Sequence, residues 1–369
     1  MRFHSDRCQA FGGEDFPQRR LRAVITLAAV WLLGSCVSRA DDVVYRKSTD
    51  KRLGGTVSQI SKTELTIKPR AGETVTVPVN DIAAIDWDDA PAEFKLARSD
   101  ESAGRFDSAR QRLMKCLDEV KSSKDGLRTD VEYLLARATA RGALADPSGR
   151  DEAVAKLTAF LKSHADSFRY YEAQQLLGQV QLARQDYAQA RAAFEALGQA
   201  PWNEAQLSSQ INLGRVLMAE NRLDEAAQSF DAAMEKAIAA EDAVGRYQAM
   251  LGKARSLIAQ NRPADALAIL TEVLEKAPAD DSALQAEAYL LEGNCLQSLN
   301  KLKEAVLAYL HVDVLFSRET AYHAEALYHL SKIWKAVQHP DRALECQAKL
   351  EGLYPESEWT KRLEPGLSE

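Results

Sequence analysis

The chain has 369 residues, which is enough for more than one domain and for a substantial core. It carries 47 Lys and Arg residues against 54 Asp and Glu residues, a formal net charge of -7. An acidic chain repels a phosphate backbone unless its basic residues gather on one face, so we expect no nucleic acid partner.

The first forty residues have the features of an export signal. Arg19, Arg20 and Arg22 precede an eleven-residue apolar stretch at 23–33. That stretch is shorter than the roughly 20 residues that a membrane-spanning helix needs, and is typical of a signal peptide. We therefore interpret residues 1–40 as a signal peptide and expect the protein in the periplasm or cell envelope of a bacterium.

Two cleavage sites fit this signal, and an uncleaved membrane anchor is the remaining alternative. Ser-Arg-Ala at 38–40 offers small residues to a signal peptidase and would release a soluble chain that begins at Asp41. Leu-Gly-Ser-Cys at 33–36 resembles a bacterial lipobox, in which Cys36 would be lipidated and would anchor the protein to a membrane. Loss of residues 1–40 leaves 41 basic and 51 acidic residues, a net charge of -10.

Residues 41–90 are predicted to form a small β module. Short runs rich in Val, Thr and Ile alternate with turn residues, and an apolar segment that ends at Trp87 closes the series. About five strands in so short a segment cannot form two sheets, so we expect a small curled barrel. In length and strand spacing it resembles SH3-like and Sm-like barrels. The RNA-contacting motif of Sm proteins is not recognisable, so we interpret the segment as an accessory docking module.

After Pro91, one ten-residue pattern recurs seven times. Its sixth residue is always alanine: Ala109, Ala153, Ala190, Ala226, Ala266, Ala305 and Ala343. Twelve residues earlier, six of the units have another small residue: Ala97, Gly178, Gly214, Ala254, Gly293 and Ser331. The second unit differs because its turn at 142–149 is longer. Small residues at both places allow two helices to cross closely, and a large tenth residue such as Phe230 fills the space beside the crossing.

This pattern resembles the tetratricopeptide repeat over residues 91–360. The resemblance implies a mainly α fold, a right-handed helical solenoid of about seven helix pairs, preceded by the β module and followed by a tail at 361–369. Most units exceed the usual repeat length of that family, and the aromatic residue at the start of the first helix is mostly missing. We expect the extra residues to lengthen helices or turns.

No catalytic constellation stands apart from the packing pattern. The chain has no GxSxG, HExxH, Walker, GxGxxG or paired-carboxylate signature. His323 and His329 are six residues apart, which places them on different faces of a helix. The three aspartates that end the β segment lack the ligand series of an EF-hand. We therefore predict that the protein is not an enzyme and holds no metal or cofactor.

The cysteines and aromatic residues are interpreted chiefly as packing residues rather than as reactive or ligand-binding groups. Cys116, Cys295 and Cys346 are expected to be small buried side chains, with a disulfide between the last two as the alternative. Tyr171, its neighbour at 170 and Trp202 fall at repeat boundaries, where aromatic rings commonly fill gaps between helix pairs. Ligand stacking is the other interpretation of these rings. Four aromatic residues near the C-terminus fit either a core or a binding patch: Phe316, Tyr322, Tyr328 and Trp334.

The sequence therefore predicts an exported adaptor or scaffold. A solenoid leaves a large concave face free, and the family resemblance implies that this face binds a peptide or protein segment. One alternative is an architectural envelope component that self-assembles. Another makes the β module the ligand binder and the repeats a stalk.

The resemblance also suggests which residues face the concave side. The residue after the small position supplies hydrogen-bond donors: Gln179, Arg215, Arg255, Asn294 and Lys332. Four residues earlier stand apolar or aromatic residues: Ile211, Leu251, Leu290 and Tyr328. Alternating apolar and donor positions would suit an acidic segment or a C-terminal carboxylate. The alternative is that these donors neutralise acidic residues on adjacent helices.

Overall fold

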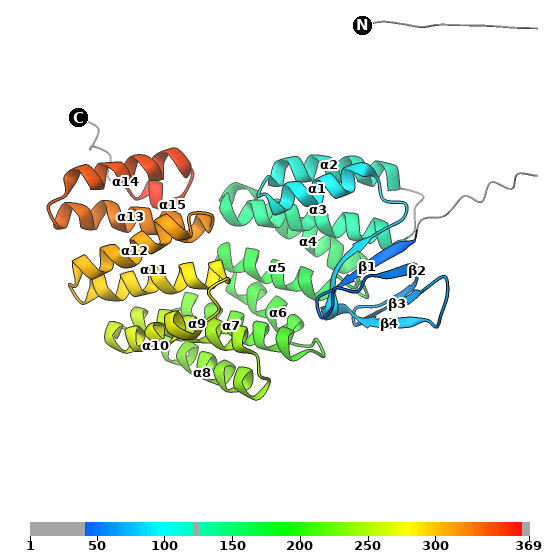
Figure 1. Ribbon diagram of the computed structural model, residues 1–369, viewed down its shortest axis with the longest axis horizontal. Helices are drawn as coiled ribbons and strands as arrows, with labels where there is room; N and C mark the ends of the chain where they lie inside the picture. Colours follow the sequence, from blue (N-terminus) through cyan, green and yellow to red (C-terminus); the bar gives the residue numbers. More distant parts are fainter. Residues whose placement is uncertain (1–40, 121–124, 364–369) are drawn as a thin grey trace, which may run out of the picture. The chain divides into compact units, whose positions relative to one another are not determined.

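The computed structural model describes residues 41–120 and 125–363 (Figure 1). The predicted signal peptide, Cys36 and residues 364–369 lie outside these ranges. The described chain begins with five β-strands and a 3-10 helix: β1 (Asp42–Arg46), β2 (Leu53–Ile60), β3 (Glu64–Lys68), β4 (Val75–Pro78), η1 (Val79–Asp81) and β5 (Ile82–Asp86).

The strands form one antiparallel sheet in the order β4-β3-β2-β1-β5. The predicted strands are confirmed, but the closed barrel is not found. Among the described residues β4 and β5 are the two edges and do not pair with each other. Alternation along β3 buries Leu65 and Ile67 and exposes the flanking Glu64 and Lys68, so one face of the sheet packs on a core.

The rest of the described chain is helical: α1 (Ala92–Ser102), α2 (Phe106–Glu119), α3 (Asp125–Ala145), η3 (Pro147–Gly149), α4 (Arg150–Ser163), α5 (Tyr170–Ala183), α6 (Tyr187–Leu197), α7 (Asn203–Ala219), α8 (Leu223–Ala239), α9 (Ala243–Ala259), α10 (Pro263–Lys276), α11 (Ser282–Ser298), α12 (Leu302–Leu315), α13 (Thr320–Ala336), α14 (Pro340–Leu353) and α15 (Glu358–Lys361). In the part that the structure describes, α1–α14 form the seven predicted helix pairs.

The ten-residue pattern begins at the turn inside a pair. Its first residue has a positive φ at Asn221 (60°), Asn261 (58°) and Asn300 (58°). The N–H groups of Asn221 and of the next residue bond back to carbonyls of α7, which ends that helix. Asn tolerates this left-handed conformation better than most residues, and Gly104 takes the same role in the first pair with φ 73°.

The small residues lie where the helices of a pair cross, as predicted. A Cβ added at Gly214 would stand 2.8 Å from Phe230 Cε1, and one at Gly293 would stand 2.5 Å from Tyr309 Cε1. Ala226 has no exposed surface. These positions therefore admit no larger side chain without movement of the packed ring.

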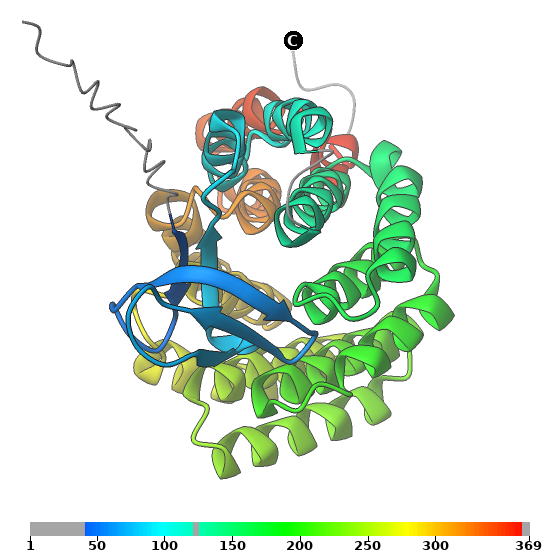
Figure 2. The same cartoon turned by 90° about the vertical axis from the view of Figure 1, so that its right-hand side faces the viewer.

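The helices form two layers. Each odd-numbered helix from α3 to α11 contacts the next odd-numbered helix, whereas the even-numbered helices contact chiefly their neighbours in sequence. Figure 2 shows successive pairs turning about a common axis. The odd-numbered helices therefore form the inner layer. None of the described helices is long and apolar enough to cross a membrane.

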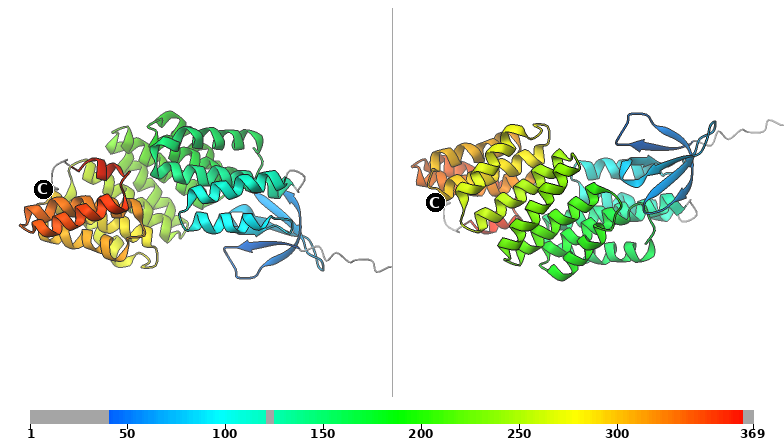
Figure 3. Two further views of the ribbon diagram at one scale, coloured as in Figure 1. Left: turned by 90° about the horizontal axis from the view of Figure 1, so that it is seen from above. Right: turned by 90° about the horizontal axis from the view of Figure 1, so that it is seen from below.

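The sheet packs on the first helix pairs and shares their core, and its role as a docking module stays a prediction. The strands lie beside the first helices of the array (Figure 3), and the apolar residues of the sheet and of α1–α5 belong to one core. The indole Nε1 of Trp87 donates to Asp130 Oδ2 at 3.0 Å, and Arg169 Nε donates to Asp130 Oδ1 at 2.9 Å. At Gly126, an added Cβ would lie 2.7 Å from the Trp87 ring. The close approach of sheet and helix thus depends on a glycine and a buried carboxylate.

Candidate functional site

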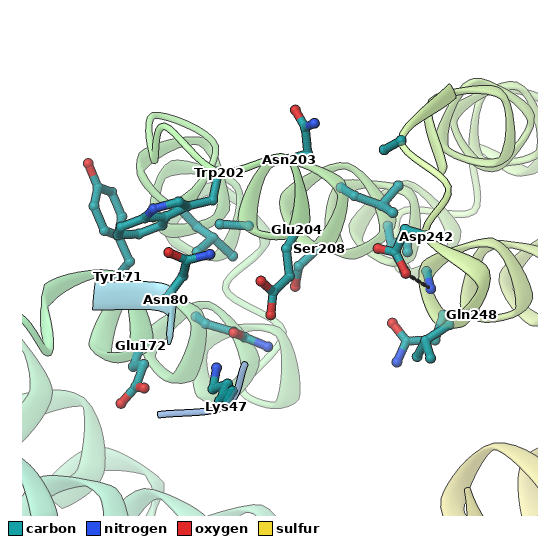
Figure 4. A pocket seen from close by; sticks show the side chains of 18 of the residues that line it. Lys47, Asn80, Tyr171, Glu172, Trp202, Asn203, Glu204, Ser208, Asp242 and Gln248 are labelled. Carbon is teal, nitrogen blue, oxygen red and sulfur yellow. Dashed lines mark hydrogen bonds between the residues drawn. The ribbon is translucent and has the colours of Figure 1, made fainter. Parts of the chain in front are cut away.

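A groove of about 960 Å³ lies between the sheet and the inner layer of helices (Figure 4). We call it the inner groove. The end of β1 and the turn η1 form one wall, and the N-terminal halves of α5, α7 and α9 form the rest. The lining of the groove includes the following residues: Lys47, Asn80, Tyr171, Glu172, Gln175, Trp202, Glu204, Ser208, Ile211, Glu241, Asp242 and Gln248.

A hydrogen-bonded turn fixes the sheet wall of the groove. Asp81 accepts from Arg46 Nε at 2.7 Å and from the backbone N–H of Ser48 at 2.8 Å. Desolvation opposes the charge, but these bonds outweigh it and hold the pKa of Asp81 below its usual value. The turn thereby places Lys47 and Asn80 at the groove. Oδ1 of Asn80 is buried and has no hydrogen-bond partner among the described residues.

Two aromatic rings form one end of the groove. Tyr171 on α5 and Trp202 before α7 meet edge to face, with ring centroids 5.4 Å apart. Tyr171 is 7% exposed and also donates from its hydroxyl to the carbonyl of Gln199. These rings fill the gap between the third and fourth pairs, as expected, and they also line the groove (Figure 4). The two interpretations of the sequence are therefore compatible.

The groove carries four carboxylates and one lysine. Asp242 caps α9 by accepting from the N–H of Gly245 at 2.8 Å, and Glu172 pairs with Arg169 at 2.9 Å. Glu204 and Glu241 are exposed, and their carboxylates have neither a hydrogen bond nor an ion pair with any described residue. Figure 4 shows Glu204 beside Ser208 in the middle of the groove. Negative charge without a partner therefore faces this space.

Further along the inner layer, predicted donors meet acidic residues. Arg255 Nη2 lies 3.0 Å from Glu287 Oε1, and the hydroxyl of Tyr322 donates to Glu287 Oε2 at 2.9 Å. Burial would raise the pKa of Glu287, but Arg255 and then Arg215 outweigh it and keep that pKa low. We call Arg215, Arg255, Glu287 and Tyr322 the inner ladder. Glu287 compensates Arg255, as the alternative interpretation of the donors predicted for that residue, whereas Arg215 donates to Asn212.

Three of the predicted apolar positions of the concave face are buried, and two of them, Leu251 and Leu290, do not line the inner groove. Ile211 is 2% exposed, Leu251 is 2% exposed and Leu290 is fully buried. All three pack in the cores between helices. Four residues are slightly more than one helical turn, so these side chains are rotated by about 40° from the donors, toward the paired helix. Only Ile211 also reaches the floor of the inner groove.

The remaining predicted residues lie on the inner layer in different surroundings. Tyr328 is partly covered by the C-terminal Trp359, with ring centroids 5.3 Å apart, and Lys332 Nζ lies 5.8 Å from the Tyr328 ring centre. Asn294 accepts from the Tyr309 hydroxyl at 2.6 Å. Gln179 is half-buried on α5. The structure therefore does not gather the nine predicted residues into one surface.

The described residues contain no group of three side chains that could hold a metal ion. The buried His323 bonds to Asp313 and to the Tyr354 hydroxyl, each at 2.7 Å, and so it belongs to the packing of the last pair. Each of the three described cysteines is free and buried, so the alternative disulfide is not formed. Burial raises the pKa of the Cys116 thiol to about 11, which keeps the thiol protonated and unreactive.

Sequence reasoning missed the residues that give the inner groove its character. Asn80 lies in a turn of the sheet segment, and Glu204 and Glu241 lie at helix ends in different repeats. Glu204 and Glu241 come together because α7 and α9 are neighbours in the inner layer, and Asn80 joins them because the sheet packs on α1–α5. The one available signal was the recurrence of acidic residues near the starts of α5, α7 and α9.

Comparisons with known proteins agree with this architecture. Residues 176–243 and 251–312 match the family model described as tetratricopeptide repeat. No curated protein matches the sequence significantly.

Solved structures show the same fold at low sequence identity. A tetratricopeptide repeat protein from Parabacteroides merdae is 17% identical, with a TM-score of 0.50 over 73% of this chain and 96% of that chain. The apo form of the quorum sensor NprR from B. thuringiensis is 12% identical, with a TM-score of 0.53 over 71% and 75%. Rap protein complexed with Competence and Sporulation Factor is 15% identical, with a TM-score of 0.51 over 72% and 76%. The protein is thus a solenoid of tetratricopeptide-like helix pairs, preceded by a five-stranded antiparallel sheet.

Proposed function

We propose that the protein is a non-enzymatic scaffold whose inner face binds an extended segment of a partner polypeptide. The inner groove is the observation that carries this proposal, because it joins an aromatic end, unpaired polar groups and a volume of about 960 Å³. The similar Rap structure is a complex with Competence and Sporulation Factor, which supports the same use of the fold.

The inner groove is a better candidate than the inner ladder. An acidic segment or a C-terminal carboxylate at the ladder would have to compete with Glu287 for Arg255. Opening a compensated ion pair costs about as much as the new pair returns, so the ladder offers little net affinity. The acidic partner suggested by the sequence is therefore not part of this proposal.

Self-assembly is a second candidate function. On α12, Leu307, Val314 and Leu315 are 59%, 69% and 63% exposed. Exposed leucines and valines on one helix favour an interface between proteins. Light scattering after size-exclusion chromatography tests this: Leu307→Lys with Leu315→Lys should convert a dimer to a monomer if α12 forms the interface.

We also propose that the chain is exported, on the strength of the basic and apolar residues at 19–33. Intact mass of the protein from its native envelope fraction distinguishes the two forms. A chain starting at Asp41 indicates a soluble form, and a diacylated Cys36 indicates a lipid anchor. A full-length chain in the cytoplasm would contradict both.

Site-specific photocrosslinking in the native host tests the scaffold proposal. A benzoylphenylalanine replaces Gln248 or Gln175 in the inner groove, and Gln228 on the outer helix α8 serves as the control. We expect discrete adducts with a partner polypeptide from the two groove positions and none from Gln228. Equal adducts at all three positions, or none at the groove, would contradict the proposal.

A further inference from the structure

We propose that the inner groove selects a positively charged segment of the partner, in which a Lys or Arg side chain stands next to an apolar side chain. This inference rests on the proposed function and adds the chemistry of the ligand. It also reverses the sign of charge that the sequence suggested for the partner.

The charge of the groove is the first argument. Four carboxylates and one lysine line it, a net charge of -3 in one space. Asp242 accepts a hydrogen bond as the N-cap of α9, and Glu172 forms an ion pair with Arg169. Nothing among the described residues compensates Glu204 or Glu241. A cationic side chain from a partner would supply the missing charge, whereas an acidic one would add repulsion.

Helix dipoles do not replace a counter-ion at either carboxylate. Glu204 lies in the first turn of α7, where the dipole favours its charge. Glu241 lies between the C-terminal end of α8, where the dipole disfavours its charge, and the N-cap of α9, where the dipole favours it. Both carboxylates therefore lack a cationic partner among the described residues.

The sheet wall contributes an acceptor that needs a donor. Less than 1 Å² of Asn80 Oδ1 is exposed, and the atom has no partner among the described residues. The oxygen becomes available to a ligand only when the Asn80 side chain turns toward the groove, and a ligand that brings an N–H group would then satisfy it. Lys, Arg and backbone amides carry such donors, but an ionised carboxylate carries none.

The aromatic end of the groove can bind both the apolar side chain and the Lys or Arg side chain of the proposed partner segment. Trp202 is half-buried and presents part of its ring to the groove beside Tyr171. Aromatic faces attract Lys and Arg as well as apolar side chains. The same corner of the molecule already shows such a contact, because Lys62 Nζ lies 5.6 Å from the ring centre of Tyr170.

Fluorescence anisotropy with the full-length protein tests the inference with two defined probes. One is a fluorescein-labelled peptide containing Lys-Trp-Lys-Leu-Lys, and the other contains Glu-Trp-Glu-Leu-Glu. We expect the basic probe to bind with an affinity that falls as NaCl is raised, and the acidic probe not to bind. Equal binding of both probes, or preference for the acidic one, would overturn the inference.

Variants with opposite expected effects locate the site. Glu204→Gln with Glu241→Gln removes two screened charge pairs and should weaken the basic probe roughly 5- to 30-fold. Lys47→Gln removes the one cation of the lining and should strengthen it. A folding defect cannot produce both signs. The matched control, Glu235→Gln with Glu351→Gln on α8 and α14, makes the same change in net charge and should leave binding unchanged.

Two outcomes separate this inference from the proposed function. If the double variant at Glu204 and Glu241 binds the basic probe as well as the native protein does, charge selection by the groove is wrong. If photocrosslinking at Gln248 then still captures a neutral or acidic segment, the scaffold function stands with a different ligand. Absence of any groove adduct would instead remove the scaffold function itself.

Discussion

The two ends of the helical array are built differently. The sheet and α1–α5 share one continuous apolar core, which also encloses the paired Asp130 and Arg169. From the fourth pair onward, the buried residues fall into separate clusters that span one or two pairs each. Nearest-neighbour packing of that kind makes stability a sum of local terms, whereas a shared core responds as a unit. The same repeat pattern therefore supports both a cooperative body and a modular chain.

The largest expected effect tests the cooperative end of the array, which consists of the sheet and α1–α5. Asp130→Ala removes the acceptor of Trp87 and the buried partner of Arg169, which keeps only its pair with Glu172. Breaking a buried ion pair from one side costs about 3–5 kcal/mol of unfolding free energy. Urea unfolding should show this loss for the sheet and α1–α5 together, because they share a core. The control Asp107→Ala touches an exposed pair with Arg110 and should change stability by less than about 0.5 kcal/mol.

The second prediction concerns the C-terminal end and pH. His329 stacks on Tyr309 at 5.1 Å and packs against Trp359, and burial followed by Arg362 lowers its pKa from 6.5 to about 4. The unfolded chain therefore binds a proton at a higher pH than the folded chain does. Stability supplied by the neutral ring is complete above pH 6.5 and falls as the pH drops toward 4, by at most about 3 kcal/mol.

Unfolding curves between pH 7 and pH 4 check this linkage. His329→Phe keeps an aromatic ring but cannot bind the proton, so its stability should fall less than that of the native protein over this range. His311→Phe, on the exposed side of α12, is the control and should follow the native protein. Parallel curves for native protein and His329→Phe would contradict the role given to His329.

The third prediction tests the helix crossings of the modular region. Ala226 is fully buried beside Phe230, so Ala226→Leu should overpack the crossing and cost about 1–3 kcal/mol. The loss should appear mainly in α7 and α8, as measured by hydrogen exchange. Gln228 is exposed on the same helix, and Gln228→Leu should cost much less. Equal costs at the two positions would mean that the crossing is not where packing is tight.

The smallest expected effect has the opposite sign. A Cβ added at Gly352 in α14 would meet nothing within 4 Å, so Gly352→Ala should raise stability by up to about 0.5–1 kcal/mol through helix propensity. Gly293→Ala makes the same chemical change where the Cβ would stand 2.5 Å from the Tyr309 ring, and it should destabilise. Thermal melts should show a higher melting temperature for Gly352→Ala and a lower one for Gly293→Ala than for the native protein. A higher melting temperature for both variants would refute the prediction.

The modular region was predictable from sequence because its packing repeats. Ala226, Gly214 and the positive φ of Asn221 all follow from positions within one unit. The cooperative end was not predictable in the same way. The contact between Trp87 and Asp130 joins residues from different kinds of structure and has no period. Sequence reasoning therefore took the sheet for a separate module.

The candidate site shows the same limit. The repeat pattern placed Arg255 on the inner layer, but it could not show that Glu287 of the next pair would reach it. It also placed Leu251 and Leu290 on the concave face, although both are buried between helices. The inner groove depends on a turn of the sheet, so no rule derived from repeats alone could have predicted it.

The sheet has one more consequence, for the ways in which such a chain can change length in evolution. A sheet covers one end of the array, and at the other end Trp359 of α15 lies against α13. In the described ranges, each end of the array therefore carries an element outside the repeat pattern. Gene duplication would leave both elements in place if it inserted a unit between existing pairs, such as after α8 or α10. Since the inner groove lies on α5, α7 and α9, an insertion after α10 would extend the array and leave the groove intact.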